Sequence, residues 1–172
     1  FAADNRDEAM PLPSAMTAYQ PVLDFYTPGG MKYPGAPSSY ILLPTAYHHW
    51  DHERFPSTID VILLTSRDGL RWYRPAPRQP YLSLGLDGGP SCGMIFANPW
   101  LIIAGDEVWI YYAGTSRTHQ ESGSDPARSG LFRARLRLDG FLSADAPESG
   151  GTFTTPPLKF NGRQLELNVD TG

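Results

Sequence analysis

The chain contains one cysteine, Cys92, among its 172 residues. A disulfide within the chain is therefore excluded, and cysteine usage leaves the redox compartment open. Long apolar runs are also missing, because none approaches the roughly 20 residues that a membrane-spanning helix needs. We therefore expect no membrane span, and the composition assigns the protein to no cellular location.

Positive charge is scarce and dispersed. The 14 lysines and arginines are outnumbered by 18 aspartates and glutamates, which gives a formal net charge of −4 at pH 7. A phosphate-binding surface needs a concentrated basic patch, so nucleic acid is not expected as a partner. A neutral ligand rich in hydroxyl groups fits this balance better.

Glycine and proline are plentiful, at 17 residues each, and they separate β-rich runs in the manner of turn residues. These runs repeat in order. Gly93-Met94 repeats Gly30-Met31 63 residues later, and each pair is followed by an apolar strand, at 40–47 and at 108–114. The strand at 40–47 is apolar on both faces, which is expected of a strand that lies between two neighbouring sheets.

A second strand then runs into an Asp-Gly turn in each repeat, at 60–69 and at 130–140. In the first turn we expect Gly69 to adopt a positive φ, the Asp68 carboxylate to cap backbone N–H groups, and Trp72 to pack back on the hairpin. An all-β unit of roughly 65–70 residues that repeats in order is typical of a β-propeller blade.

The strand at 131–138 alternates apolar and polar residues, so one of its faces is expected to be exposed. Arg133, Arg135 and Arg137 share that face. We interpret them as a solvated edge that protects the strand from pairing with other chains, and not as a ligand clamp.

The predicted fold class is all-β, with two β-propeller blades followed by the start of a β-sandwich. Residues 1–22 are interpreted as an N-terminal arm or the end of a preceding element, 23–148 as the two blades, and 149–172 as the start of the sandwich, with a hairpin turn at Asn161-Gly162. Two blades cannot close a ring. We therefore expect a fragment of a longer protein, or self-association through open blade faces and sheet edges.

The innermost strand of each blade lines the central funnel of a propeller. According to the repeat, these strands lie at 30–35 and 93–98, which places Tyr33 and Phe96 at equivalent funnel positions. An aromatic ring at such a position would stack on the apolar C–H face of a sugar. The alternative is that both rings pack in the junction between the blades.

The loops that follow the two apolar strands are rich in histidine and charge. The first loop carries His48, His49 and Asp51, and the second carries Arg117 and His119. Equivalent placement on two blades suits a rim that binds a polyol, because such side chains form directed hydrogen bonds with hydroxyl groups. A pair of solvated loops is the alternative.

His48, Asp51 and His52 have metal-ligand spacing only on a helix, and Pro56 with the flanking β pattern argues against a helix. No metal site and no organic cofactor are predicted. Glycoside hydrolysis needs two carboxylates that flank the scissile bond. Four acidic residues lie near the predicted funnel: Asp24, Asp51, Glu53 and Glu121. None has a setting specific enough to name, so no catalytic residue is assigned.

Five stretches carry a resemblance to a known family: Tyr-Pro-Gly-Ala-Pro-Ser-Ser-Tyr at 33–40, Asp-Val-Ile-Leu-Leu-Thr-Ser-Arg-Asp-Gly-Leu-Arg-Trp at 60–72, Gly-Met-Ile-Phe-Ala at 93–97, and the runs 108–119 and 150–171. Over residues 24–172 the chain resembles the C-terminal half of bacterial five-bladed β-propeller glycoside hydrolases, the fold shared by invertases, levanases and arabinanases. The resemblance implies about three further blades upstream, a sandwich downstream, and a nucleophile or base on an earlier blade. The chain departs from the family pattern at Ser91, where that pattern has aspartate.

The first functional hypothesis is a part of a glycoside hydrolase-like protein that acts on a glycan but lacks the full catalytic set. The second is a non-catalytic carbohydrate-binding or cell-surface propeller module, and the third is a purely structural β domain. A pair of carboxylates roughly 5–9.5 Å apart at one funnel mouth would favour hydrolysis. Aromatic side chains without such a pair would favour binding.

Overall fold

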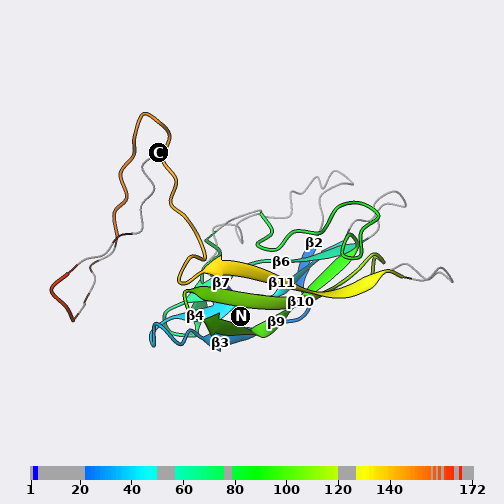
Figure 1. The fold of residues 1–172 in the computed structure, drawn as a ribbon, viewed down its shortest axis with the longest axis horizontal. Coiled ribbons are helices and arrows are strands. Elements are labelled where there is room, and N and C mark those ends of the chain that lie inside the picture. The colour runs from blue at the N-terminus through cyan, green and yellow to red at the C-terminus, as the bar shows by residue number, and fades with distance from the viewer. Residues whose placement is uncertain are drawn as a thin grey trace. The chain divides into compact units, whose positions relative to one another are not determined.

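The structure is a computed structural model that describes residues 2–3, 22–49, 57–75, 79–119, 127–155, 157, 159, 161–164 and 167. Within these residues the fold is all-β, with eleven strands, and no helix is long and apolar enough to span a membrane (Figure 1). The strands are β1 (Ala2–Ala3), β2 (Val22–Phe25), β3 (Gly30–Lys32), β4 (Tyr40–Leu42), β5 (Thr45–His49), β6 (Thr58–Val61), β7 (Leu64–Ser66), β8 (Arg71–Trp72), β9 (Met94–Ala104), β10 (Glu107–Thr115) and β11 (Ser129–Arg137).

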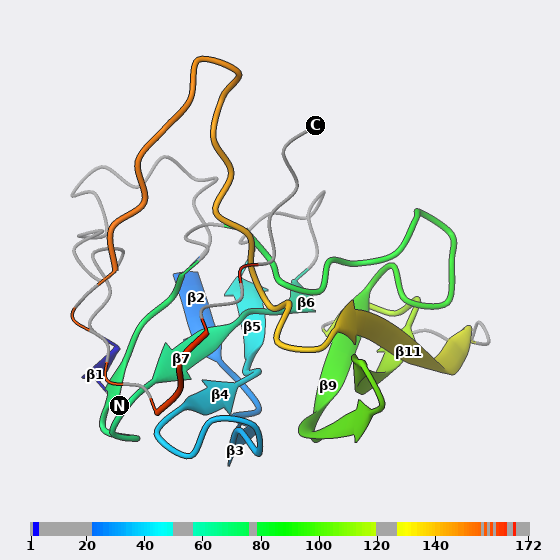
Figure 2. The ribbon, with the colours of Figure 1, turned by 60° about the vertical axis from the view of Figure 1, so that its left-hand side comes forward.

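The described strands form three sheets, and none of these sheets closes on itself. The largest has six strands in the order β11-β10-β9-β6-β5-β2, the second has the order β3-β4-β7, and β1 pairs with β8. Most neighbouring strands are antiparallel, whereas β6 and β9 run parallel, as do β1 and β8. Figure 2 shows β9 and β11, the two strands that flank β10, on one side and β4, β5 and β7 grouped on the other.

The six-stranded and three-stranded sheets share a bent hairpin. β4 leads directly into β5 and β6 leads into β7, and the pairs Leu42–Leu64 and Thr45–Val61 belong to one uninterrupted antiparallel register. Pro44 lies at the bend, which suits a residue that has no backbone N–H to contribute to a ladder. The hairpin therefore passes from one sheet into the other, and the register between its two strands stays the same.

Further strands extend this hairpin on both sides. β2 pairs with β5 and β3 pairs with β4 on one side. On the other side Thr65 and Tyr73 exchange two backbone hydrogen bonds of 2.8 Å, which places the β8 segment next to β7. We call residues 22–73 the first meander, because its strand segments are antiparallel neighbours in chain order.

β9, β10 and β11 form a second antiparallel meander. Residues 98–100 of β9 lie opposite Tyr111 alone, which is a β-bulge. Pro99 occupies the bulge, and Asn98 Oδ1 accepts a hydrogen bond from Trp100 N at 2.9 Å. The bulge therefore accommodates a proline inside a long strand without leaving the next N–H unpaired.

Apolar residues of both meanders form the core. Ile59 and Val61 of β6 are fully buried, and so are Ile95, Val108 and Ile110 of the second meander. β9 contacts β3, β5 and β6, and the β-bridge between Ile59 and Met94 joins the meanders edge to edge. The contact between the meanders is thus mainly hydrophobic.

The segment formed by β4 and the first part of β5 is buried on both of its faces, as the sequence predicts for residues 40–47. Every residue from Ile41 to Tyr47 is buried. Alternate residues of a strand point to opposite faces, so neither face of this strand is open to solvent. A separate cluster on one face consists of Leu42, Ala46, Ile62, Leu64 and Trp72.

The Asp-Gly turn of the first meander has the predicted construction. Gly69 has a φ of 74°, and Asp68 Oδ1 accepts hydrogen bonds from Leu70 N at 2.8 Å and Arg71 N at 2.7 Å. The N–H groups of Arg71 and Leu70 hold the pKa of Asp68 below its usual value. Trp72 is buried in the adjacent cluster, so all three expectations for this turn are confirmed.

The alternation predicted for the strand at 131–138 is confirmed in β11. Its nine residues alternate strictly between exposed and half-buried, and Arg133, Arg135 and Arg137 all lie on the exposed face. In the described part of the chain β11 pairs with β10 alone and forms the edge of the largest sheet.

The chain divides into two compact units, residues 1–140 and 141–172. The described residues of the second unit contain no strand. Most residues of the predicted arm at 1–22, and several that would form the hairpin around Asn161-Gly162, lie outside the described residues. The arm and the sandwich therefore stay predictions.

A tyrosine–aspartate hydrogen bond connects the two meanders at the end that carries the Asp-Gly turns. Tyr33, which follows β3, is buried, and its hydroxyl donates to Asp139 Oδ1 at 2.6 Å. Asp139 itself has a φ of 60° in the turn after β11. Burial, reinforced by the hydrogen bond to Asp139, raises the pKa of Tyr33 to about 12.

Replacing Tyr33 with phenylalanine removes this hydrogen bond and keeps the ring. We expect Tyr33→Phe to lower the free energy of unfolding by about 1 kcal/mol at neutral pH, because a bond to an exposed carboxylate is lost. The folded chain holds the Tyr33 proton more tightly than the unfolded chain, where the pKa is about 10. The stabilisation that the Tyr33–Asp139 hydrogen bond provides is therefore complete below about pH 10 and is lost as the pH rises towards about 12.

Urea unfolding of both chains across this range measures the effect. The stability difference between the wild type and Tyr33→Phe should be constant below about pH 10 and should shrink above it. A difference that stays the same at every pH would contradict the assignment of Tyr33 as the titrating group.

Candidate functional site

One end of the largest sheet gathers most of the predicted site residues. β5 and β10 end there, and β2, β6, β9 and β11 begin there, as their registers require. The loops that connect β5 to β6 and β10 to β11 leave from this end, which we call the loop end. Tyr33 and the Asp-Gly turns lie at the opposite end.

Three rings from both meanders meet near the loop end and form an aromatic cluster, which Tyr26 joins from a backbone position beside Thr45 at the start of β5. The His119 ring lies 4.8 Å from the Tyr47 ring and 5.2 Å from the Tyr26 ring, both edge-on, and the two tyrosine rings are 5.9 Å apart. His119 Nε2 is 3.2 Å from the Tyr26 hydroxyl. Edge-on geometry is a favourable arrangement for such rings, so the cluster is a specific contact.

Burial differs sharply within this aromatic cluster. Tyr47 is only 7% exposed, whereas Tyr26 is 50% exposed and His119 is also exposed. The backbone N–H of His119 donates to Ser57 O at 3.1 Å, which fixes the loop after β10 against the start of β6. The cluster therefore has a fixed base in Tyr47 and an open surface formed by Tyr26 and His119.

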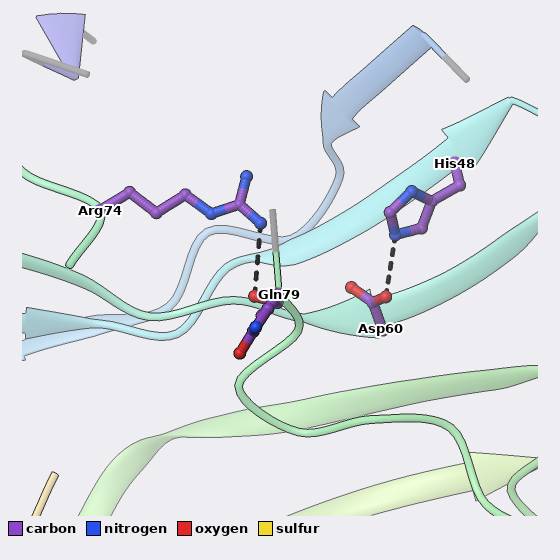
Figure 3. Close-up of polar contacts among 4 residues, drawn as sticks. All are labelled: His48, Asp60, Arg74 and Gln79. Atoms are coloured by element: carbon purple, nitrogen blue, oxygen red, sulfur yellow. Dashed lines mark hydrogen bonds and ion pairs between the residues drawn. The ribbon is translucent and has the colours of Figure 1, made fainter. Parts of the chain in front are cut away.

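A histidine–aspartate pair lies on the neighbouring strands β5 and β6 (Figure 3). His48 Nε2 is 2.9 Å from Asp60 Oδ2, and the two side chains are 20% and 13% exposed. A carboxylate only accepts hydrogen bonds, so Nε2 carries the proton. The second oxygen, Asp60 Oδ1, is buried and has no hydrogen-bond partner among the described residues.

The pair and the aromatic cluster are separated by the sheet. Tyr47 and His48 are consecutive residues of β5, and consecutive side chains of a strand point to opposite faces. Figure 3 also shows Arg74, whose Nη2 donates to Gln79 O at 3.4 Å after β8. The predicted rim is thus divided between two faces and does not form one surface.

The remaining rim residues have simpler settings. Arg117 is half-buried, and its backbone N–H donates to Thr115 Oγ1 at 3.3 Å. His49 pairs through its backbone with Val22, its side chain is not described, and Asp51 lies outside the described residues. Of the rim residues whose side chains the structure describes, His119 is the one that belongs to the aromatic cluster.

Tyr33 and Phe96 do not occupy equivalent positions, contrary to the alignment of the sequence repeat. Tyr33 follows the last residue of β3, whereas Phe96 is the third residue of β9. Gly30 and Met94 each begin a strand, but β9 begins at the loop end whereas β3 lies toward the opposite end, so the repeat misaligns the two strands. The buried Tyr33, bonded to Asp139, has the setting of a junction residue.

Phe96 lines a hollow of about 470 Å³ on the face of the second meander that carries the β11 arginines. Its other lining residues are mostly small: Ala113, Gly114, Thr115, Ser129, Gly130 and Leu131. The hollow forms because small side chains leave space between the larger Phe96 and Leu131. It offers few polar groups to a ligand.

Tyr26, Tyr47 and Asp60 were not among the predicted site residues. For Asp60 a signal existed, because a charged residue between Ile59 and Val61 in an apolar strand needs a partner when it is buried. Tyr26 and Tyr47 gave no comparable signal, since tyrosine is common in strands.

The described residues contain no group of three or more His, Cys, Asp or Glu side chains that would hold a metal ion. Of the four acidic residues predicted near the funnel, Asp24 is exposed at the loop end. The other three, Asp51, Glu53 and Glu121, lie outside the described residues.

Comparison of the chain with protein-family models, with curated proteins and with solved structures gave no match. A function therefore has to be argued from the residues of this chain. Among the described residues near the loop end, the aromatic cluster and the His48–Asp60 pair are the features on which such an argument can rest.

The His48–Asp60 pair should contribute to stability, because both side chains are largely buried. We expect His48→Ala to lower the free energy of unfolding by about 1–2 kcal/mol, since it leaves a buried carboxylate without this partner. The exposed His119→Ala variant, which loses two edge-on ring contacts, should lower the free energy of unfolding by about 0.5–1 kcal/mol. Urea unfolding of both variants, with Asp60→Asn and the double variant, measures the coupling. Strictly additive effects would show that the pair does not interact.

Proposed function

We propose that this chain is part of a β-propeller protein of the glycoside hydrolase-like kind, and that its aromatic cluster binds a neutral glycan. The observation that carries the binding proposal is the half-exposed Tyr26 ring, held against His119 and Tyr47 at the loop end. The proposal is one of binding, and it assigns no catalytic residue to the described part of the chain.

Two features support the propeller interpretation. Antiparallel meanders follow one another in the chain, and the strand pairs β5–β6 and β10–β11 are each connected by a loop at the same end. Consecutive meanders in contact, with their loops on one side, are what two neighbouring propeller blades provide. The open sheets agree with a chain that holds only part of the ring.

The chemistry of the aromatic cluster suits a sugar. A tyrosine ring presents an apolar face to the C–H groups of a pyranose or furanose, and its hydroxyl donates and accepts hydrogen bonds. The two ring nitrogens of His119 offer further hydrogen-bonding positions beside it. Because Tyr47 and Ser57 fix these groups in place, little side-chain freedom remains to be lost on binding.

Hydrolysis is less well supported by the described residues. It needs two carboxylates roughly 5–9.5 Å apart around the scissile bond. Asp60 is bonded to His48 on the face away from Tyr47, and Asp24, the register partner of Tyr47 on β2, supplies a single carboxylate beside the aromatic cluster. The alternative is a non-catalytic carbohydrate-binding propeller module, and the aromatic cluster is equally compatible with that function.

Binding of neutral oligosaccharides to the purified chain tests the proposal. Isothermal titration with fructan, arabinan and glucan oligomers should identify a ligand. Tyr26→Ala and His119→Ala should then weaken its binding by roughly tenfold each, because one stacking face or one ring contact is lost. Tyr73→Ala is the matched control, since Tyr73 is also about half-exposed but lies beside β7.

Two results would contradict the proposal. One is the absence of binding to any neutral oligosaccharide by a chain that circular dichroism shows to be folded. The other is an identified glycan whose affinity is unchanged in both Tyr26→Ala and His119→Ala.

A further inference from the structure

The outer edge of β11 is open in the described part of the chain, whereas the corresponding edge of the first meander is covered. β7 pairs with the β8 segment through Thr65 and Tyr73. β11, the third strand of its own meander, pairs with β10 alone among the described strands. An open edge presents a row of unpaired backbone N–H and C=O groups to any extended chain.

Three arginines line the exposed face of this edge. Every second residue of β11 from 133 to 137 is an arginine: Arg133, Arg135 and Arg137. The Cα atoms of neighbouring arginines are therefore roughly 6.8 Å apart, the rise of two residues in an antiparallel strand. This row of positive charge is unusual in a chain whose formal net charge is −4.

Side chains of β10 hold the row in place. The Arg133 guanidinium lies 4.3 Å from the centre of the Trp109 ring. Trp109 Nε1 donates to Glu107 Oε2 at 2.7 Å, and Glu107 Oε1 accepts from Arg135 Nη1 at 3.4 Å. Glu107 is the carboxylate of this network among the described residues, so the two guanidinium groups of Arg133 and Arg135 exceed its single negative charge by one positive charge.

The other face of β11 is apolar. Phe132, Ala134 and Leu136 are half-buried there, and the Phe132 ring stacks on Tyr112 at 5.2 Å. A strand added to the edge of β11 would thus meet cations on one face and apolar side chains on the other. These two faces specify the chemistry of the strand that fits.

We propose that the open edge of β11 binds an extended segment of a partner protein in which acidic residues alternate with apolar ones. The acidic side chains lie opposite the arginine row, and the apolar side chains extend the row that contains Phe132 and Leu136. Backbone hydrogen bonds supply affinity, and the alternating side chains supply selectivity.

A second copy of this chain fits the edge less well. Antiparallel pairing of two β11 strands with the apolar faces aligned places arginines opposite arginines, and like charges in directly opposed positions are destabilising. Charge complementarity therefore selects an acidic partner over self-pairing.

Fluorescence anisotropy with designed peptides and the full chain tests this inference. The probe is a labelled peptide of alternating valine and glutamate, and its matched control alternates valine and lysine. The glutamate peptide should bind at least about tenfold more tightly than the lysine peptide, and added salt should weaken it. Methylation of its alternate backbone nitrogens should abolish binding, since paired N–H groups are then missing.

Protein variants locate the surface. The double variant Arg133→Glu with Arg135→Glu should bind the glutamate peptide about tenfold or more weakly than the wild type does. The same variant should bind the lysine peptide more tightly than the wild type does. Arg71→Glu, another exposed arginine on a strand, should leave both affinities unchanged.

Three outcomes would overturn the inference. Equal binding of the glutamate and lysine peptides would remove the charge argument. Equal binding of the methylated peptide, or tighter binding of a sulfated polysaccharide, would make the edge a general polyanion site. A dimer in light scattering that the double arginine variant abolishes would assign the edge to a second copy.

Discussion

The contact between β9 and the first meander determines how the described first unit is arranged. Only one residue pair, Ile59–Met94, joins β6 to β9 by backbone pairing. Buried apolar side chains such as Ile95 and Val108 also stabilise this junction, together with the hydrogen bond from Leu101 N to Met31 Sδ at 3.2 Å. Hydrophobic burial is proportional to area and has no direction, so the Tyr33–Asp139 bond supplies a directional constraint at the far end.

The same junction creates the candidate site. Tyr26 and Tyr47 belong to the first meander and His119 to the loop after β10, so the aromatic cluster exists only when the two meanders are docked. The His48–Asp60 pair is different, because both residues belong to the first meander. Docking of the two meanders therefore positions the aromatic cluster, whereas strand pairing within the first meander positions the His48–Asp60 pair.

Local features were predictable from the sequence, and distant pairings were not. The Asp68–Gly69 turn and the alternation in β11 depend on a few consecutive residues, and both agree with the structure. The partners of Tyr33 and His119 are 106 and 93 residues away, at Asp139 and Tyr26, and no local pattern encodes such distances. The Gly-Met repeat misplaced Tyr33 against Phe96 because two residues are too short a match to fix a strand register.

The bulge in β9 determines which changes of length this strand tolerates. Three residues, 98–100, stand opposite one, so the bulge adds two positions and preserves the alternation of faces. Ile95 and Leu101 consequently point to the same side and are both buried. Loss of two residues from the bulge would keep that order, whereas loss of one would turn half of β9 inside out. Natural variation in this segment should therefore occur in steps of two.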